Sequence, residues 1–207
     1  MEEDKYAICV KNWKAELRSQ VQAIVKAGKR KPFMTIVQIE NNGSNDLVDT
    51  VIKECQDLKI SVDHYRIPVE EINIEQFCNL LVNISCDGTW VVLPAGNFEY
   101  EDFKRAIWPA QDINGLLFDS RPKPAIVKAI KCYINSQNIT PGVAKVNIKS
   151  HLLYPVVEYL VDSEWQVLVG GQADGDLVID DNMINGEDIT DLWICGLIEN
   201  LLEAYGD

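Results

Sequence analysis

The chain has 207 residues and a net charge of −13, because 32 Asp and Glu outnumber 19 Lys and Arg. That acidity argues against nucleic-acid binding and against binding to an anionic membrane, since both need a basic face. No apolar stretch reaches bilayer-spanning length and the first residues lack a secretory signal pattern, so we expect a cytoplasmic protein.

The six cysteines are scattered along the chain and form no C-x-x-C pair. Their spacing matches neither a metal site nor a redox motif. Most of them fall within apolar runs, where a reduced cysteine behaves as a small hydrophobic residue. We therefore expect reduced cysteines and no metal centre. The six are Cys9, Cys55, Cys78, Cys86, Cys132 and Cys195.

The first half of the chain shows a repeated strand–helix order. Apolar residues recur at three- and four-residue spacing over residues 6–27, which predicts an amphipathic helix that Gly28 ends. Residues 87–96 predict a strand buried on both faces, because an apolar run follows an Asp-Gly turn and Pro94 ends it. The other elements predicted in this half are strands at 33–39 and 60–67 and helices at 44–58, 71–84 and 100–107.

The second half follows a predicted linker at residues 108–124, which holds three prolines. The elements predicted after it are helices at 124–134, 151–161 and 190–205 and strands at 143–148, 165–169 and 177–179. The βα order predicts an α/β fold of two domains, three-layer α/β/α with mainly parallel sheets. The last helix has a wide apolar face, so we assign residues 1–120 and 190–207 to the first domain and 121–189 to the second.

Four segments carry a resemblance to a known family. Residues 87–94 resemble the D-G-I-L-V-Q-L-P strand of the methylenetetrahydrofolate dehydrogenase/cyclohydrolase family, and residues 109–115 resemble its P-x-K-D-V-D-G segment. Residues 36–55 are similar to its V-G-D-x-x-A-S-x-x-Y-V-x-x-K-x-K-x-C segment, and residues 197–204 to its closing L-L-E-N-T-L-E-A helix. The resemblance implies two domains with an active-site cleft between them, the second domain being a reduced Rossmann-like fold.

The resemblance also marks where folate chemistry has been lost. In the family a tyrosine and, four residues later, a lysine face the one-carbon bridge of the folate, and here Leu47 and Val51 hold those places. Neither side chain can accept or donate a proton. Val92 stands for the family glutamine that supports the lysine, and Asn114 stands for the aspartate that grips the pterin. Together with Pro94, these residues are expected to line an apolar ligand cleft that either binds a small molecule or has closed.

The cofactor loop that the resemblance implies is changed as well. Residues 148–156 stand in place of the family's G-R-S-x-x-V-G-x-P loop, whose glycines let the backbone approach dinucleotide phosphates. Lys149 and Ser150 match in kind and are the candidate cofactor-binding residues, but Tyr154 fills space that a pyrophosphate needs. Acidic residues at 186–191 replace the family's P-G-G-V-G-P-M-T loop. We expect no cofactor; NADP or NAD would bind only if the chain is an active enzyme.

Three further patterns indicate ordinary structure rather than a site. Residues 170–175 contain G-G-x-x-x-G but lead into a strand, so they predict a flexible connection and not a phosphate loop, which needs a helix N-terminus. The acids between 174 and 191 lack the spacing of a calcium loop and predict a solvated edge. His64, on the alternating strand 60–67, is expected to be exposed.

These observations favour a pseudoenzyme, a protein with the folate dehydrogenase/cyclohydrolase scaffold that has lost both activities. The first alternative is a divergent enzyme that still acts in one-carbon folate metabolism, with Lys53 or Cys86 as its proton carrier. The second alternative is a protein-interaction module that uses its acidic face or forms a homodimer. The family tends to pair through the second domain, and strand residues around Val167 are the candidates for that surface here.

Overall fold

The computed structural model describes residues 5–40, 45–93, 95–117, 120, 122–170, 175–184 and 186–206. The chain divides into two compact units, which we name after their strands. The β1–β3 unit consists of Glu16–Pro122 and Leu197–Asp207, and the β4–β6 unit consists of Met1–Ala15 and Lys123–Gly196. Helices α1 (Lys5–Lys26) and α8 (Glu187–Gly206) each contribute residues to both units.

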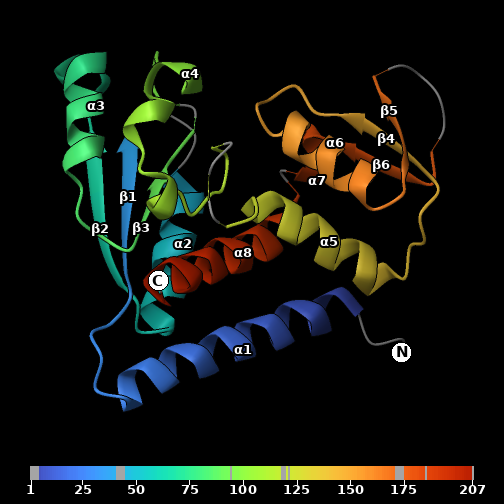
Figure 1. Cartoon of the computed structure of the whole chain (residues 1–207), viewed down its shortest axis with the longest axis horizontal. Helices are drawn as coiled ribbons and strands as arrows, with labels where there is room; N and C mark the ends of the chain where they lie inside the picture. Colours follow the sequence, from blue (N-terminus) through green and yellow to red (C-terminus); the bar gives the residue numbers. More distant parts are fainter. Residues whose placement is uncertain are drawn as a thin grey trace. The chain divides into compact units, whose positions relative to one another are not determined.

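The β1–β3 unit is built on a three-stranded parallel sheet in the order β2-β1-β3 (Figure 1). Its strands are β1 (Phe33–Ile39), β2 (Ser61–Ile67) and β3 (Gly88–Val91). The central strand β1 is buried from Met34 to Ile39, including the polar residues Thr35 and Gln38, which fits a strand covered on both faces. The edge strand β2 alternates between exposed and half-buried residues, which agrees with its alternating sequence.

Two helices, α2 (Asn45–Asp57) and α3 (Ile74–Asn83), connect these strands. Helix α3 begins at Ile74 rather than at residue 71, because Asn73 and Gln76 form a capping box with two 3.0 Å hydrogen bonds. The residues before it form a 3₁₀ turn, η1 (Val69–Glu71). After β3, the helix predicted at 100–107 is divided into α4 (Tyr100–Phe103) and the 3₁₀ turn η2 (Lys104–Ala106).

Residues 108–117 pack into the β1–β3 unit, so their interpretation as a linker is wrong. The 3₁₀ turn η3 (Pro109–Gln111) leads to Asp112, which forms a parallel bridge with Thr89 of β3. Ile113 is completely buried, and Asn200 of α8 donates a hydrogen bond to its carbonyl. Prolines mark turns as well as linkers, and here the turns close around a buried apolar residue.

The β4–β6 unit contains a second parallel sheet, in the order β5-β4-β6, with β4 (Val143–Asn147), β5 (Gln166–Val169) and β6 (Leu177–Asp180). Its other helices are α5 (Ala125–Gln137), α6 (Leu153–Asp162) and α7 (Asp181–Ile184). Ala144 and Val146 of β4 are buried, whereas Lys145 between them is half-buried, so the core covers one face of this sheet most fully. Most of the connection predicted at 170–175 lies outside the described residues.

The structure joins Cys9 of α1 to Cys132 of α5 in a disulfide. The prediction that the cysteines are all reduced is therefore wrong for this pair. The two residues are 123 positions apart, and only the packing of their helices brings them together, which sequence spacing cannot reveal. The remaining cysteines, Cys55, Cys78, Cys86 and Cys195, are thiols.

His64 of β2 is half-buried, so the expectation that it is exposed is wrong. Its Nε2 lies 3.0 Å from Oε1 of Gln38, a buried polar residue of the central strand β1. This contact with a polar side chain of the neighbouring strand stabilises the half-buried position of the His64 ring. None of the described helices combines the length and the apolar character needed to cross a bilayer.

Candidate functional site

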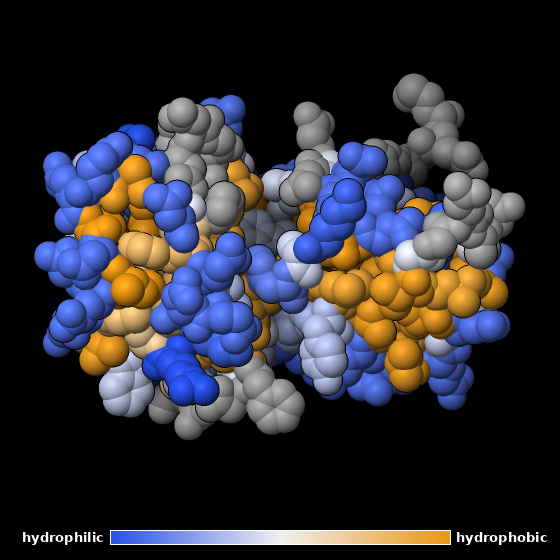
Figure 2. Space-filling model, turned by 90° about the horizontal axis from the view of Figure 1, so that it is seen from above, coloured by the Kyte–Doolittle hydropathy of each residue, from blue (hydrophilic) through white to orange (hydrophobic). Residues whose placement is uncertain are grey.

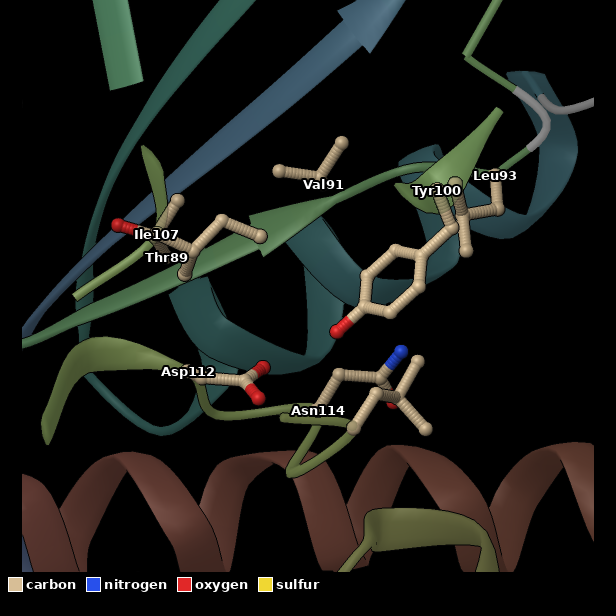
Figure 3. A pocket seen from close by; sticks show the side chains of 8 residues that line it. Thr89, Val91, Leu93, Tyr100, Ile107, Asp112 and Asn114 are labelled. Carbon is tan, nitrogen blue, oxygen red and sulfur yellow. The ribbon is translucent and has the colours of Figure 1, made fainter. Parts of the chain in front are cut away.

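A small pocket lies beside β3 in the β1–β3 unit (Figure 3). Thr89 and Val91 of β3 and Leu93 beyond it line one side, because alternate residues of a strand face the same way. Figure 3 shows the Tyr100 hydroxyl directed toward Asp112 and Asn114. The full lining is Thr89, Val91, Leu93, Tyr100, Ile107, Asp112, Asn114 and Leu116.

Asp112 is the buried carboxylate of this pocket, and its hydrogen bonds hold the surrounding loop. It accepts from the backbone N–H groups of Gly115 at 3.1 Å and Leu117 at 2.9 Å. It also accepts from the hydroxyl of Ser120 at 2.5 Å. These three donors lie within eight positions of Asp112 in the sequence. The carboxylate therefore closes a local turn, which explains why an acid is buried here.

Tyr100 is the other titratable group in the lining. Burial raises the pKa of its hydroxyl, and the negative charges of Asp112 and Glu101 raise it further. The hydroxyl is therefore protonated at neutral pH, and a general base cannot come from this side chain. Near neutral pH the residue can donate a hydrogen bond or fill space.

The size of the pocket limits what it can hold. It contains about 10 Å³ of space for the centre of a water molecule. One buried water needs roughly that much room. A pterin ring is far larger, so the pocket as it stands has room only for a group about the size of a water molecule.

The sequence-predicted cleft residues fall in different environments. Asn114 lines the pocket, whereas Val51 and Val92 are buried in the core with 0% and 2% of their surface exposed. Val92 follows Val91 along the chain, so it faces the opposite side of the sheet from the pocket-lining residues. Leu47 of α2 is half-buried, and Pro94 lies outside the described residues. Of the residues predicted to line the cleft, Asn114 thus lines this pocket.

The two alternative proton carriers also differ in their surroundings. Lys53 is exposed on α2. Cys86 is half-buried beside β3, and its Sγ lies 3.1 Å from the carbonyl oxygen of Gly88 and 3.3 Å from Oγ1 of Thr89. Since Thr89 lines the pocket, Cys86 is separated from it by a single side chain.

Sequence reasoning missed Tyr100 and Thr89 as pocket residues. Both are polar residues at element boundaries or in an otherwise apolar strand, and Thr89 is 5% exposed. The available signal was Thr89 itself, a polar residue directly before the apolar residues Trp90–Val92. Tyr100 could not be placed because its position depends on where the short helix α4 begins.

The candidate cofactor residues lie after β4 in the β4–β6 unit, where both are exposed. The backbone N–H of Lys149 donates to the carboxylate of Asp181 at 3.3 Å. The Ser150 hydroxyl oxygen accepts from the N–H of Leu152 at 3.3 Å, ahead of α6. A phosphate would compete with these internal acceptors for the same backbone groups. Within the described part of the chain, no cluster of three or more His, Cys, Asp or Glu residues has a metal-binding arrangement.

The comparisons with known proteins reveal the fold. No protein-family model and no curated protein matches the sequence. A bifunctional methylenetetrahydrofolate dehydrogenase/cyclohydrolase from Campylobacter jejuni matches with a TM-score of 0.80 at 15% identity, over 98% of this chain and 97% of that chain. The corresponding enzyme from Trypanosoma brucei, solved with NADP and an inhibitor, matches with a TM-score of 0.78 at 15% identity, over 100% and 97%.

A third solved structure agrees with these two. The 5,10-methylenetetrahydrofolate dehydrogenase from Bombyx mori matches with a TM-score of 0.77 at 17% identity, over 98% of this chain and 97% of that chain. At such identities the likeness establishes the fold alone. The α/β fold of two small parallel sheets that the sequence motifs predicted is confirmed.

Proposed function

Starting from the fold that this chain shares with methylenetetrahydrofolate dehydrogenase/cyclohydrolases, we propose that it is a pseudoenzyme without either folate activity. One observation carries the proposal. Val51, which the sequence resemblance aligns with the family lysine, is a core residue with 0% of its surface exposed. A valine transfers no proton, and a position inside the core offers no place for a substrate to meet one.

The neighbouring replacements support the same proposal. Val92, aligned with the supporting glutamine, is buried, and Asn114 lines a pocket with room for about one water. We do not propose folate binding in that pocket, because a pterin ring is far larger than the space that the pocket offers. The scaffold is retained while the positions that carried chemistry have become packing positions.

The proposed loss extends to the dinucleotide. The backbone N–H of Lys149 already donates to Asp181, the first residue of α7, which directly follows β6. An acid at this place repels phosphate as well as competing for the donor. Tyr154 follows in the first turn of α6, where the family loop has space for the pyrophosphate.

The test is an assay of purified protein for methylenetetrahydrofolate oxidation with NADP and with NAD, and for methenyltetrahydrofolate hydrolysis. The Campylobacter jejuni enzyme serves as the positive control, and circular dichroism verifies that the tested protein is folded. We expect no turnover above the buffer rate. Turnover above that rate would overturn the proposal, and its loss in Lys53→Met or Cys86→Ser would establish the divergent-enzyme alternative.

A second candidate function is a protein-interaction module that pairs with its own copy. Figure 2 shows hydrophobic side chains gathered on the β4–β6 unit, on the right of the view. The large apolar residues most exposed in this unit are Tyr154, Val161, Val169 and Val178, with 45% to 69% of their surface accessible. Val169 ends the edge strand β5, where a row of backbone groups can pair with another chain.

Analytical ultracentrifugation over a wide concentration range tests this candidate. We expect a dimer whose dissociation constant rises at least tenfold in Val169→Lys, because a charge at the strand edge opposes pairing. Lys131→Gln, at an exposed position of α5, is the control and leaves association unchanged. A wild-type monomer at the highest concentration would contradict the homodimer.

A further inference from the structure

Cys9 and Cys132 meet within the β4–β6 unit although no sequence motif links them. Cys9 lies in the first half of α1 and Cys132 in the middle of α5, and the two form a disulfide. Both residues are half-buried, so small reagents in solution can approach the pair. A half-buried disulfide between two helices can react with thiols in solution, whereas a thiol sealed in a core is inert.

We propose that Cys9 and Cys132 are a reversible thiol–disulfide pair whose oxidation by a small-molecule disulfide locks the first half of α1 onto α5. One cysteine thiolate attacks a sulfur of oxidised glutathione, which forms a mixed disulfide and releases one glutathione thiolate. The second cysteine thiolate then attacks the protein sulfur of that mixed disulfide and releases the second glutathione. Two protein thiols are oxidised to one disulfide, and one oxidised glutathione is reduced to two thiols.

Of the four thiols, three are buried or have a raised pKa, which disfavours such exchange. Cys55 and Cys195 are buried, and burial together with the charge of Glu54 raises the pKa of the Cys55 thiol to about 12. Burial and the charge of Asp102 raise the pKa of Cys78. A raised pKa removes the thiolate that attacks a disulfide. Cys86 is half-buried and its thiol interacts with Gly88 and Thr89.

Most residues of the locked segment are exposed or half-buried. Within residues 5–15, Val10 is the buried member of the hydrophobic core of this unit, and Tyr6 and Trp13 pack against it partly exposed. The disulfide fixes this segment to α5 across a separation of 123 positions. Reduction therefore removes a covalent restraint from a segment that packing holds only in part.

The test equilibrates the full chain with mixtures of reduced and oxidised glutathione, traps thiols by alkylation and maps them by mass spectrometry. We expect Cys9 and Cys132 to become protected together, in a single two-electron step. Oxidation should raise the melting temperature by about 5–15 °C. It should also slow amide exchange in residues 5–15 more than in residues 16–26 of the same helix.

Matched variants separate this pair from the other thiols. Cys9→Ser and Cys132→Ser each lose the two-electron step, whereas the double variant Cys78→Ser, Cys86→Ser keeps it. The mapping on the wild-type chain stands even where a serine variant fails to fold. The proposal is overturned if both residues are alkylated at every glutathione ratio, or if either stops at a stable mixed disulfide with glutathione.

Discussion

The side-chain amide of Asn200 in α8 donates a hydrogen bond of 2.7 Å to the backbone carbonyl of Ile113, 87 positions earlier in the chain. Both residues are completely buried. They lie in two of the segments that carry the family resemblance, the closing helix and the loop after η3. The bond ties the end of the chain to the β1–β3 unit, so part of the resemblance records structure rather than chemistry.

We predict that Asn200→Ala lowers the free energy of unfolding by about 1–3 kcal/mol, because it leaves a buried carbonyl without its donor. Asn200→Asp should cost at least as much, since its carboxylate would face the same carbonyl oxygen. Urea denaturation of the two variants and the wild type measures the effect. Equal stability of Asn200→Ala and wild type would show that the bond contributes nothing.

Most of the fold could be predicted from sequence because its signals are local. The mostly apolar, β-branched sequence of β1 and the three- and four-residue spacing of apolar residues in α1 predict the element type without knowledge of neighbours. The misses arise where distant contacts decide. Ile113 is core because α8 returns to it, and Cys9 bonds Cys132 because two helices meet.

The candidate site was predictable only in part. Asn114 was found because a sequence motif marks its position, and it lines the pocket. Tyr100 belongs to no such motif, and its position in the lining depends on where the short helix α4 begins. Val51 is an apolar residue at a motif position where the family has a lysine, and the sequence shows that difference. The sequence does not show that Val51 is completely buried.

Arg30 and Asp87 form a bidentate ion pair just before β3. The two guanidinium nitrogens of Arg30 lie 2.6 and 2.5 Å from the carboxylate oxygens of Asp87. Asp87 also accepts the backbone N–H of Phe33 at 2.8 Å. We predict that Asp87→Ala lowers the free energy of unfolding by about 1–3 kcal/mol, because the amide of Phe33 loses its acceptor. Arg30→Ala should cost less, since the Arg30 side chain is 65% exposed and solvent screens its charge. Thermal denaturation measures both changes.

The control for this prediction is the pair of Arg66 and Glu40, whose side chains are both about half exposed and lie 3.6 Å apart. Glu40→Gln should change stability by less than about 0.5 kcal/mol. If Glu40→Gln cost as much as Asp87→Ala, general surface charge rather than the buried Asp87 contacts would govern stability.

Gly88 begins β3 in a position that has no room for a side chain. A Cβ there would lie 2.2 Å from Cγ2 of Ile113 and 2.9 Å from Cδ1 of Leu201. We predict that Gly88→Ala destabilises the chain by about 1–3 kcal/mol or more through overpacking. Gly206→Ala is the control, because nothing lies within 4 Å of its added Cβ. Comparable melting temperatures for the two variants would refute the steric explanation.

His64 gives the chain a predicted pH dependence. Burial lowers its pKa below the ordinary 6.5 and the charge of Arg66 lowers it further, while that of Asp49 raises it. The unfolded chain therefore takes up this proton at a higher pH than the folded chain. The contribution of His64 to stability is present above pH 6.5 and is lost as the pH falls below it.

The measurement compares melting temperatures at about pH 7.5 and about pH 5.5 for wild type and His64→Gln. We expect the wild type to lose more stability over this interval than the variant, which carries no titrating group at this position. A His64 resonance that titrates at or above 6.5 in NMR would contradict the prediction.

Val51 provides the sharpest test of whether the position that the resemblance aligns with the family lysine is part of the core. We predict that Val51→Lys lowers the free energy of unfolding by about 3–5 kcal/mol, because the charged group must be buried or the core opened around it. Gln56→Lys, at an exposed position of the same helix, should change stability by less than about 0.5 kcal/mol. Equilibrium urea unfolding compares them. A Val51→Lys variant as stable as Gln56→Lys would mean that a lysine at position 51 reaches solvent. Position 51 would then be open to a proton-transferring side chain.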